Sequence, residues 1–265
     1  MNALPKSRAK QLRALKLRKS REEQGLFVAE GPLLIEEGFK ADVFPRYVVY
    51  CPDLIDSTRE KVEALLERCR QEGVEVFETD SGEFMTASDT VNSQGILAVF
   101  GIPAYELEPL LQKPQLTLLV LDNLRDPGNL GTIVRQAAAF DCGGLLLLKG
   151  CVDAYNHKGV RASMGGIFHV PVFDDLTPED AMRKLTDAGV WPYVTGTQGQ
   201  NAFTISYPPK TAFIIGGESE GVQPFWKDHE VIQVGIPQTD KVESLNAAVA
   251  ASILIAYRYQ AGQGQ

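Results

Sequence analysis

The sequence is poor in cysteine and histidine, with four cysteines and three histidines among its 265 residues. The cysteines stand far apart, and no Cys-x-x-Cys pair or cysteine–histidine cluster occurs (Cys51, Cys69, Cys142 and Cys151). Neither a metal site nor a disulfide framework is therefore predicted. Free thiols are typical of proteins in a reducing compartment, so we expect a cytoplasmic protein.

Long apolar runs are absent as well. The N-terminus lacks the apolar core of a signal peptide, and no run approaches the ~20 residues of a transmembrane helix. The chain also lacks the Gly-x-Gly-x-x-Gly turn of dinucleotide-binding folds and the Gly-Lys-Ser/Thr of a P-loop. No membrane partner is expected, and a nucleotide-binding oxidoreductase is disfavoured.

Positive charge is scarce except at the N-terminal end. The formal net charge is −8, which taken alone argues weakly against a nucleic-acid partner. Residues 1–21 nevertheless hold eight Lys or Arg residues and no acidic residue. A basic arm on an acidic body is typical of a segment that contacts RNA phosphates, although a solvated helix has the same composition.

Helical and strand patterns alternate along the chain, which predicts an α/β protein. Over residues 1–105 the alternation is consistent with a small α/β/α sandwich. Prolines recur in the stretch 101–115, which we interpret as a linker. The alternation restarts at Leu116, so residues 116–265 are predicted to form a second domain, with a short strand over 168–172.

A polar turn follows the apolar strand predicted over 116–121. The turn DNLRDPGN covers residues 122–129, and a helix is predicted over 130–140 with Asn129 as a plausible N-cap. Ligands bind at the carboxyl ends of strands in open α/β sheets, so this turn is a candidate site. Arg135 lies off the apolar face of the helix and can point back over the turn. An ordinary turn without chemistry explains the same local pattern.

Two further polar turns lie downstream. GGESEGV starts at Gly216 directly after a predicted strand, and its glycines allow another molecule to approach the backbone, with Glu218 at the strand end. A strand ending at Ile236 then leads through a loop to a helix that begins at Ser244 or Asn246. A glycine turn and a helix cap explain each turn alone, but three such turns favour one shared site.

The stretches DNLRDPGNLGTIVRQAAAF, IIGGESEGV and IPQTDKVESLNAAVAASILIAYR resemble the three signature motifs of the SpoU (TrmH-like) branch of the SPOUT RNA ribose 2′-O-methyltransferases. VDAYNHKGVRASMGGIFHVPV resembles the family between its first two motifs. FVAEGPLLIEEG and FMTASDTVNSQGILAVF resemble its N-terminal substrate-binding domain, which has an L30e-like fold. The resemblance implies a C-terminal SPOUT α/β domain with a deep trefoil knot, S-adenosylmethionine as cofactor, RNA as substrate and a homodimer that completes the RNA site.

The resemblance also implies roles for individual residues. Five positions match polar residues of the catalytic motifs, namely Arg135, Asn129, Glu218, Ser244 and Asn246. Five others match the loops that hold S-adenosylmethionine, namely Thr195, Gly196, Gly216, Ile236 and Leu245, and Lys158 and Arg161 are expected to bind RNA phosphates. Arginine stays protonated in nearly all sites, with a pKa above ~12. We therefore favour stabilisation of the developing alkoxide by Arg135 over a general-base role.

The chain departs from the family pattern at a few loop positions. Gly217 stands where the family usually has Asn, Ser219 where Gly is frequent, and Asp240 where Gly is frequent; Ala247-Ala248 replaces the usual Val-Ser pair. These departures affect loop geometry and cofactor affinity rather than the polar residues of the motifs.

A non-catalytic RNA-binding member of the same fold is the alternative to an enzyme. The presence of Arg135 and Asn129 favours the enzyme. Transfer RNA and ribosomal RNA are both reasonable substrates. The ribosomal-protein-like N-terminal domain favours 23S-type ribosomal RNA, because such a domain would bind folded RNA by its shape and backbone.

Overall fold

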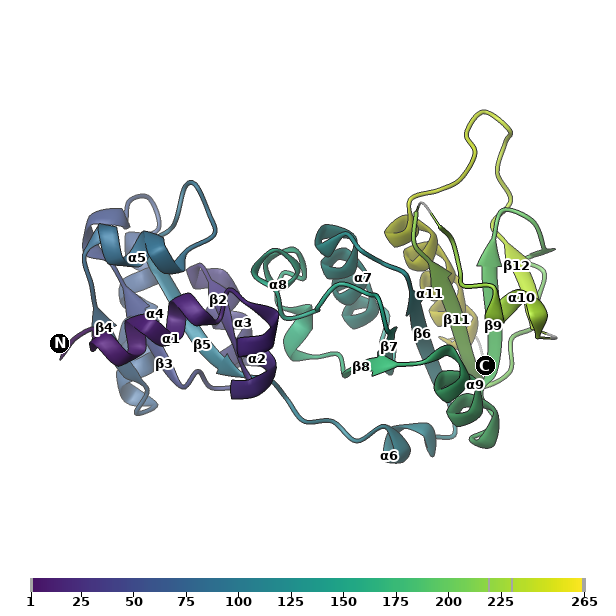
Figure 1. Ribbon diagram of the computed structural model, residues 1–265, viewed down its shortest axis with the longest axis horizontal. Helices are drawn as coiled ribbons and strands as arrows, with labels where there is room; N and C mark the ends of the chain where they lie inside the picture. The colour runs from purple at the N-terminus through teal and green to yellow at the C-terminus, as the bar shows by residue number, and fades with distance from the viewer. Residues whose placement is uncertain (1, 219, 230, 264–265) are drawn as a thin grey trace. The chain divides into compact units, whose positions relative to one another are not determined.

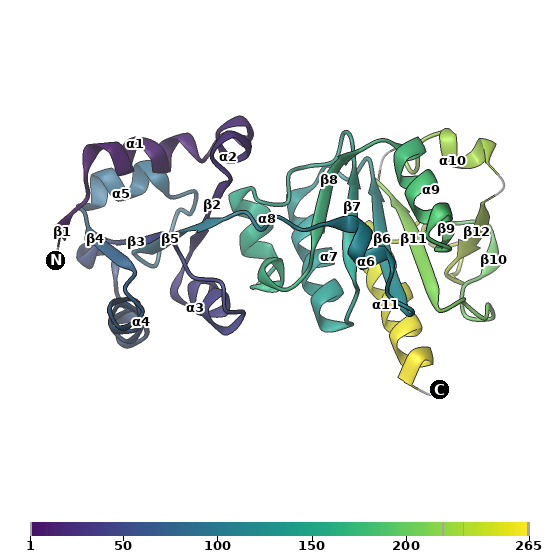
Figure 2. The same cartoon turned by 90° about the horizontal axis from the view of Figure 1, so that it is seen from below.

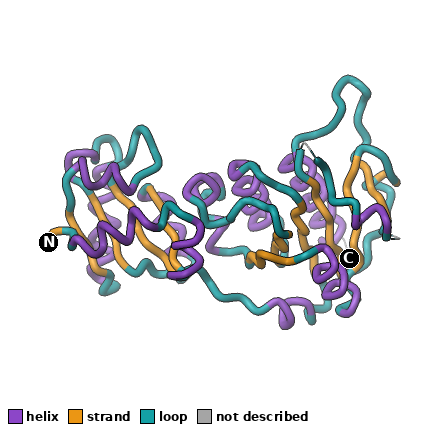
Figure 3. The backbone as a smooth tube through the Cα atoms, in the orientation of Figure 1, coloured by secondary structure: helices purple, strands orange, loops and turns teal. Residues whose placement is uncertain are grey.

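The computed structural model describes the chain almost throughout, covering residues 2–218, 220–229 and 231–263. Helices and strands alternate along it, as Figures 1 and 3 show, so the predicted α/β class is confirmed. Within the described residues, no helix is both long and apolar enough to cross a membrane.

The chain forms two compact units that are discontinuous in sequence. The first unit contains the chain up to Pro103 together with Asp153–His169, and the second contains Ala104–Val152 and the chain from Val170 onward. Residues 153–169 thus pack with the N-terminal part of the chain, whereas the sequence analysis grouped them with the C-terminal domain.

The first unit is built on a five-stranded sheet with the order β1-β4-β3-β5-β2. Strand β5 runs antiparallel to β2 and β3, and the other pairs are parallel. Helices α1 and α5 cover one face and α3 and α4 the other, which gives the predicted sandwich (Figure 2). The strands are β1 (Asn2–Ala3), β2 (Leu26–Glu30), β3 (Tyr47–Tyr50), β4 (Glu75–Glu78) and β5 (Ile96–Gly101), and the helices are α1 (Lys6–Ala14), α2 (Arg18–Gln24), α3 (Pro32–Lys40), α4 (Arg59–Gln71), α5 (Ser81–Ala87) and α8 (His157–Ala162).

The basic N-terminal segment is a folded layer of this unit. Leu12 and Leu15 are buried and pack against the sheet, because they follow the helical spacing of α1. Most of the basic side chains of the segment contact acidic ones, in the pairs Arg8–Glu75, Arg13–Glu83, Lys16–Asp89, Arg18–Glu22, Lys19–Glu23 and Arg21–Asp153. Lys6 and Lys10 are left without an ion-pair partner among the described residues. Much of the positive charge is therefore balanced within the unit.

A buried histidine makes the first unit sensitive to acid. Burial lowers the pKa of His157 below 6.5, and this outweighs the opposing effect of Asp89, whose Oδ2 lies 3.0 Å from its Nδ1. Glu30, like Asp89, raises the pKa of His157, whereas Arg21 and Lys16 add to the lowering. Because the unfolded chain binds the proton more readily, stability is full above pH 6.5 and falls as the pH drops below it toward the folded pKa.

We therefore expect the first unit to melt at a lower temperature at about pH 5.5 than at about pH 7.5. His157→Gln should reduce this difference, and His169→Gln, which changes an exposed histidine of the same unit, should preserve it. Thermal unfolding at the two pH values measures the effect. An equal pH dependence in wild type and His157→Gln would assign it to other groups.

The second unit is built on a seven-stranded parallel sheet with the order β10-β12-β9-β11-β6-β7-β8. Helices α7 and α11 pack together on one face, and α9 and α10 lie on the other (Figure 2). The strands are β6 (Leu116–Asp122), β7 (Gly144–Leu148), β8 (Val172–Leu176), β9 (Trp191–Gly196), β10 (Gln200–Asn201), β11 (Lys210–Gly216) and β12 (Ile232–Gly235), and the helices are α6 (Leu107–Leu111), α7 (Pro127–Ala139), α9 (Pro178–Asp187), α10 (Phe225–Asp228) and α11 (Ala247–Gln263).

Two predicted elements differ from the structure. Helix α7 begins at Pro127 rather than at residue 130, because proline suits the first helical position and the Asp126 carboxylate accepts the backbone N–H of Asn129 at 2.7 Å. The interpretation of Asn129 as the N-cap was therefore wrong. The strand predicted over 168–172 begins only at Val172, since a 3-10 turn ends at Phe168 and Pro171 has no N–H to pair.

Candidate active site

Three polar residues from three distant segments meet at one point of the second unit. The Nδ2 of Asn129 donates to Oε1 of Glu218 at 2.7 Å, and the Nδ2 of Asn246 donates to the same oxygen at 2.5 Å. Asn246 also donates to Oδ1 of Asn129 at 3.1 Å. The predicted convergence of the three polar turns is therefore seen in the structure, and we refer to these residues as the amide–carboxylate cluster.

Helix capping explains how this cluster is held. Asn246 caps α11, and its Oδ1 accepts the backbone N–H groups of Ala248 at 2.9 Å and Val249 at 3.2 Å. Its amide end is thereby directed toward Glu218. On α7 the capping role falls to Asp126, which leaves the side chain of Asn129 available for Glu218. Two helix N-termini thus place two amide groups around one carboxylate.

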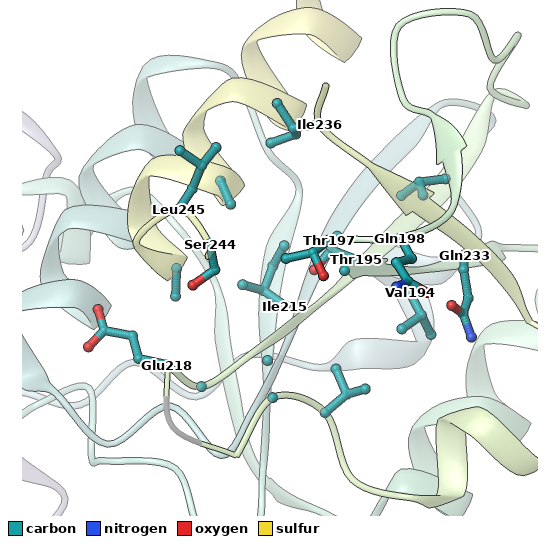
Figure 4. A pocket seen from close by; sticks show the side chains of 18 of the residues that line it. Val194, Thr195, Thr197, Gln198, Ile215, Glu218, Gln233, Ile236, Ser244 and Leu245 are labelled. Carbon is teal, nitrogen blue, oxygen red and sulfur yellow. The ribbon is translucent and has the colours of Figure 1, made fainter. Parts of the chain in front are cut away.

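A pocket of about 460 Å³ lies beside the cluster, at the carboxyl ends of β9, β11 and β12. All five residues expected to hold the cofactor line it, namely Thr195, Gly196, Gly216, Ile236 and Leu245. Ser244 and Glu218 line it too. Figure 4 shows Glu218 and Ser244 toward one end of the pocket and Gln198 and Gln233 toward the other.

The lining suits S-adenosylmethionine in size and chemistry. Ile236 and Leu245 offer apolar surface to a purine ring, and the Glu218 carboxylate complements a sulfonium cation. A Cβ atom on Gly216 would lie 2.5 Å from the carbonyl carbon of Gly221, so only glycine allows these two segments to approach. Thr195 donates its hydroxyl to the Ile214 carbonyl at 2.8 Å, which fixes the orientation of this lining side chain.

A second hollow of about 350 Å³ adjoins the first. Glu218 and Glu220 line both, and the remaining lining comes from the turn before α7 and from Asn129 in the first turn of that helix. Arg125 of that turn forms an ion pair with Glu220 at 3.0 Å, with both side chains exposed. Glu218 therefore lies at the boundary of the two hollows.

Three predicted site residues lie outside both the cluster and the two hollows. Arg135 is exposed on α7, does not line either hollow, and has no hydrogen bond or ion pair with the described residues. Lys158 and Arg161 lie on α8 in the first unit, both exposed. The sequence analysis did not single out Asp122, a fully buried residue that accepts hydrogen bonds from Gln223 and Trp226. The one feature that could have indicated it is an acidic residue at the end of an apolar strand.

The glycine at position 217 allows a close backbone contact. A Cβ atom there would lie 2.2 Å from the backbone oxygen of Asn123. Ser219, the other departure in this motif, lies outside the described residues. We expect Gly217→Ala to reduce the free energy of unfolding by about 1–3 kcal/mol, because backbone must shift to admit the methyl group.

Chemical denaturation of Gly217→Ala against wild type measures this loss. Gly262→Ala is the matched control, since its added Cβ would meet nothing closer than 3.6 Å. A Gly217→Ala variant as stable as wild type would show that the loop adapts at no cost.

Comparison with known proteins identifies the family of the chain. The SpoU rRNA Methylase family model matches residues 116–256, and the MRM3-like substrate binding domain model matches residues 6–98. The chain belongs to the SpoU rRNA methylase family. The 23S rRNA (guanosine(2553)-2′-O)-methyltransferase RlmP of Bacillus subtilis is 30% identical to this SpoU protein over 251 residues, with 94% of each chain covered.

Solved structures show the same fold. An AdoMet-bound rRNA methyltransferase from Sinorhizobium meliloti has a TM-score of 0.83 and 27% identity, covering 98% of this chain and 97% of its own. The SpoU methyltransferase AviRb from Streptomyces viridochromogenes has a TM-score of 0.86 at 24% identity, covering 98% and 99%, which supports the fold. The predictions of family, SPOUT α/β fold class, methyl-transfer reaction and cofactor are confirmed by these matches, and the trefoil knot stays a prediction.

Proposed function

We propose that this SpoU protein methylates a ribose 2′-hydroxyl of 23S-type ribosomal RNA, with the acceptor nucleotide in the second hollow. The observation that carries the proposal is the shared boundary of the two hollows at Glu218. S-adenosylmethionine, when bound, supplies an electrophilic methyl group. Transfer requires the acceptor oxygen to lie in line with that group, so donor and acceptor sites must adjoin.

The cluster residues position the reaction. Asn129 and Asn246 both donate to one oxygen of Glu218, which holds that carboxylate in a single orientation at the boundary. We assign Glu218 the role of orienting the acceptor ribose by accepting a hydrogen bond from one of its hydroxyls. Ser244 lines the pocket proposed for S-adenosylmethionine. The hydroxyl proton leaves to solvent as the oxygen–methyl bond forms and the sulfur–methyl bond breaks, and Arg135 stabilises the negative charge that develops on the acceptor oxygen.

A homodimer would give Arg135 a place in the reaction. Val249 and Tyr259 of α11 are large apolar side chains left 47% and 41% exposed, on the helix that packs against α7. We propose that a second copy covers this face and that Arg135 of one copy serves the site of the other. Sedimentation velocity of the full chain tests this, and a monomer at working concentration contradicts it.

The first unit would hold the RNA. Arg161 is exposed at the end of α8 and has no ion-pair partner among the described residues, and Lys158 is exposed on the same helix. Arg161→Ala should weaken RNA binding and reduce the slope of log affinity against log salt by about 0.7–0.9, the loss of one phosphate contact. Lys61→Ala, on the exposed face of α4, is the control. An unchanged slope would exclude a phosphate contact at Arg161.

Mapping of ribose methylation across total RNA tests the function directly. Cells or extracts with the protein should show one 2′-O-methylated ribose in 23S-type rRNA that is missing without it. Methylation found only in a transfer RNA would instead identify transfer RNA as the substrate. Donor binding without any transfer would favour the non-catalytic alternative. We place the reaction in the cytoplasm, in agreement with the four free cysteines.

A further inference from the structure

One buried residue holds both ends of the loop that carries Glu218. Asp122 is the last residue of β6, and its backbone oxygen accepts the N–H of Gly217 at 2.8 Å, where the loop begins. Its carboxylate accepts the backbone N–H and the Nε2 of Gln223, both at 2.7 Å, and the indole Nε1 of Trp226 at 2.9 Å. We call the described residues 217–218 and 220–226 the donor loop, and the pocket of about 460 Å³ the donor pocket, because both belong to the proposed site of the methyl donor.

The carboxylate is held without a cation. Asp122 is completely buried and Trp226 is 1% exposed, and no Lys, Arg or His of the described residues pairs with this carboxylate. A buried carboxylate is costly unless hydrogen bonds satisfy it. Here three N–H donors do so, all from the far end of the donor loop. The arrangement is therefore specific to one conformation of that loop.

The contacts act on the pocket only through the loop. Asp122, Gln223 and Trp226 do not line the donor pocket, whereas Glu218 and Val222 between the two anchored ends do. An effect of the three residues on S-adenosylmethionine is then transmitted by the position of the loop and of Lys227, which follows Trp226 and also lines the pocket. Loss of the far anchor is therefore expected to displace the backbone that carries Glu218.

We propose that Asp122 is a positioning residue that holds the donor loop in its binding conformation and so preforms the S-adenosylmethionine site. This rests on the proposed assignment of the pocket and of Glu218. The carboxylate acts as a hydrogen-bond acceptor for Gln223 and Trp226, and its contribution is to the shape of the pocket rather than to its charge.

Calorimetric titration of the full chain with S-adenosylmethionine tests the proposal. Asp122→Ala should weaken binding at least about tenfold, because three buried N–H groups lose their hydrogen-bond acceptor. Gln223→Ala, which removes one donor and keeps the carboxylate buried, should weaken it about threefold or more. Asp122→Asn should stay within about threefold of wild type, since its oxygen can serve the Gln223 N–H and the indole while its amide donates to a flipped Gln223.

Thr211→Val is the matched control for stability. Thr211 is fully buried on β11, far along the strand from the donor loop, and donates to the Pro208 carbonyl at 2.8 Å. The Thr211→Val substitution should destabilise the second unit while leaving the affinity for S-adenosylmethionine within about twofold of wild type. The indole N–H resonance of Trp226 gives a second readout, because Trp191→Phe leaves Trp226 as the one tryptophan of the chain. That resonance should shift in Gln223→Ala and stay in place in Thr211→Val.

Three results would contradict the proposal or the assignment on which it rests. Gln223→Ala and a folded Asp122→Ala with wild-type donor affinity would overturn the proposal. So would an Asp122→Asn variant as weak as Asp122→Ala, because the charge and not the hydrogen bonds would then matter. A wild-type chain that does not bind S-adenosylmethionine would instead refute the assignment of the pocket.

Discussion

Replacing Arg135 with alanine is expected to reduce the rate of methyl transfer by about 10²–10³-fold while S-adenosylmethionine binding stays within about twofold. The side chain is exposed on α7 and does not line the donor pocket, so neither the fold nor the donor loses a contact. The transition state loses the cation that compensates the charge on the acceptor oxygen. Single-turnover methylation and calorimetry of the same preparation measure the two quantities.

Two further variants sharpen this test. Arg135→Lys keeps the charge but not the planar fork of donors, and a large remaining defect would point to hydrogen-bonding geometry. Arg183→Ala removes an exposed arginine from α9 of the same unit and should leave the rate unchanged. If Arg135→Ala lost donor binding and transfer equally, the residue would be structural.

Deletion of residues 2–21 is expected to unfold the first unit and abolish RNA binding. The deletion removes the buried side chains of Leu12 and Leu15, each of which contributes about 2–5 kcal/mol, against a total stability of about 5–15 kcal/mol for a typical domain. It also removes Arg21, whose guanidinium bonds Asp153 at 2.5 Å and the Leu15 carbonyl at 2.7 Å. Hydrogen exchange should show loss of protection in the first unit alone.

The second unit should still bind S-adenosylmethionine after this deletion. The double variant Lys6→Ala, Lys10→Ala is the control, since it removes charge that is unpaired within the described residues and leaves the apolar layer intact. A truncated chain that remains folded and shows only a shallower salt dependence of RNA binding would instead indicate a simple electrostatic tail.

The sequence predicted elements whose causes are local. β-branched and aromatic residues at Tyr47–Tyr50 favour the strand β3, and the helical spacing of Val62, Leu65 and Leu66 favours the helix α4. The α7 N-cap was missed because Asp126 and Asn129 both have capping side chains, and only the position of Pro127 separates them. Polar motifs located the cluster, since each follows the end of a strand.

The rest depends on contacts that are distant in sequence. Asp122 accepts hydrogen bonds from Gln223 and Trp226, about 100 residues downstream, and no local sequence pattern predicts such a pairing. The ion pair of Arg21 with Asp153 is of the same kind. A basic N-terminal composition therefore indicated an arm, whereas the acidic partners that turn it into a packed layer lie on other elements.

The contribution of Asp153–His169 to the first unit has a consequence for how the protein is made. Phe27 and Phe100 contact the rings of residues in this segment, with Phe27 5.1 Å from Tyr155 and Phe100 4.8 Å from Phe168 between centroids. A nascent chain that ends before the segment leaves those two rings uncovered and Arg21 without its carboxylate. Synthesis must therefore pass residue 169 before the first unit can close, so that completion of this unit waits for strands β6 and β7 of the second unit.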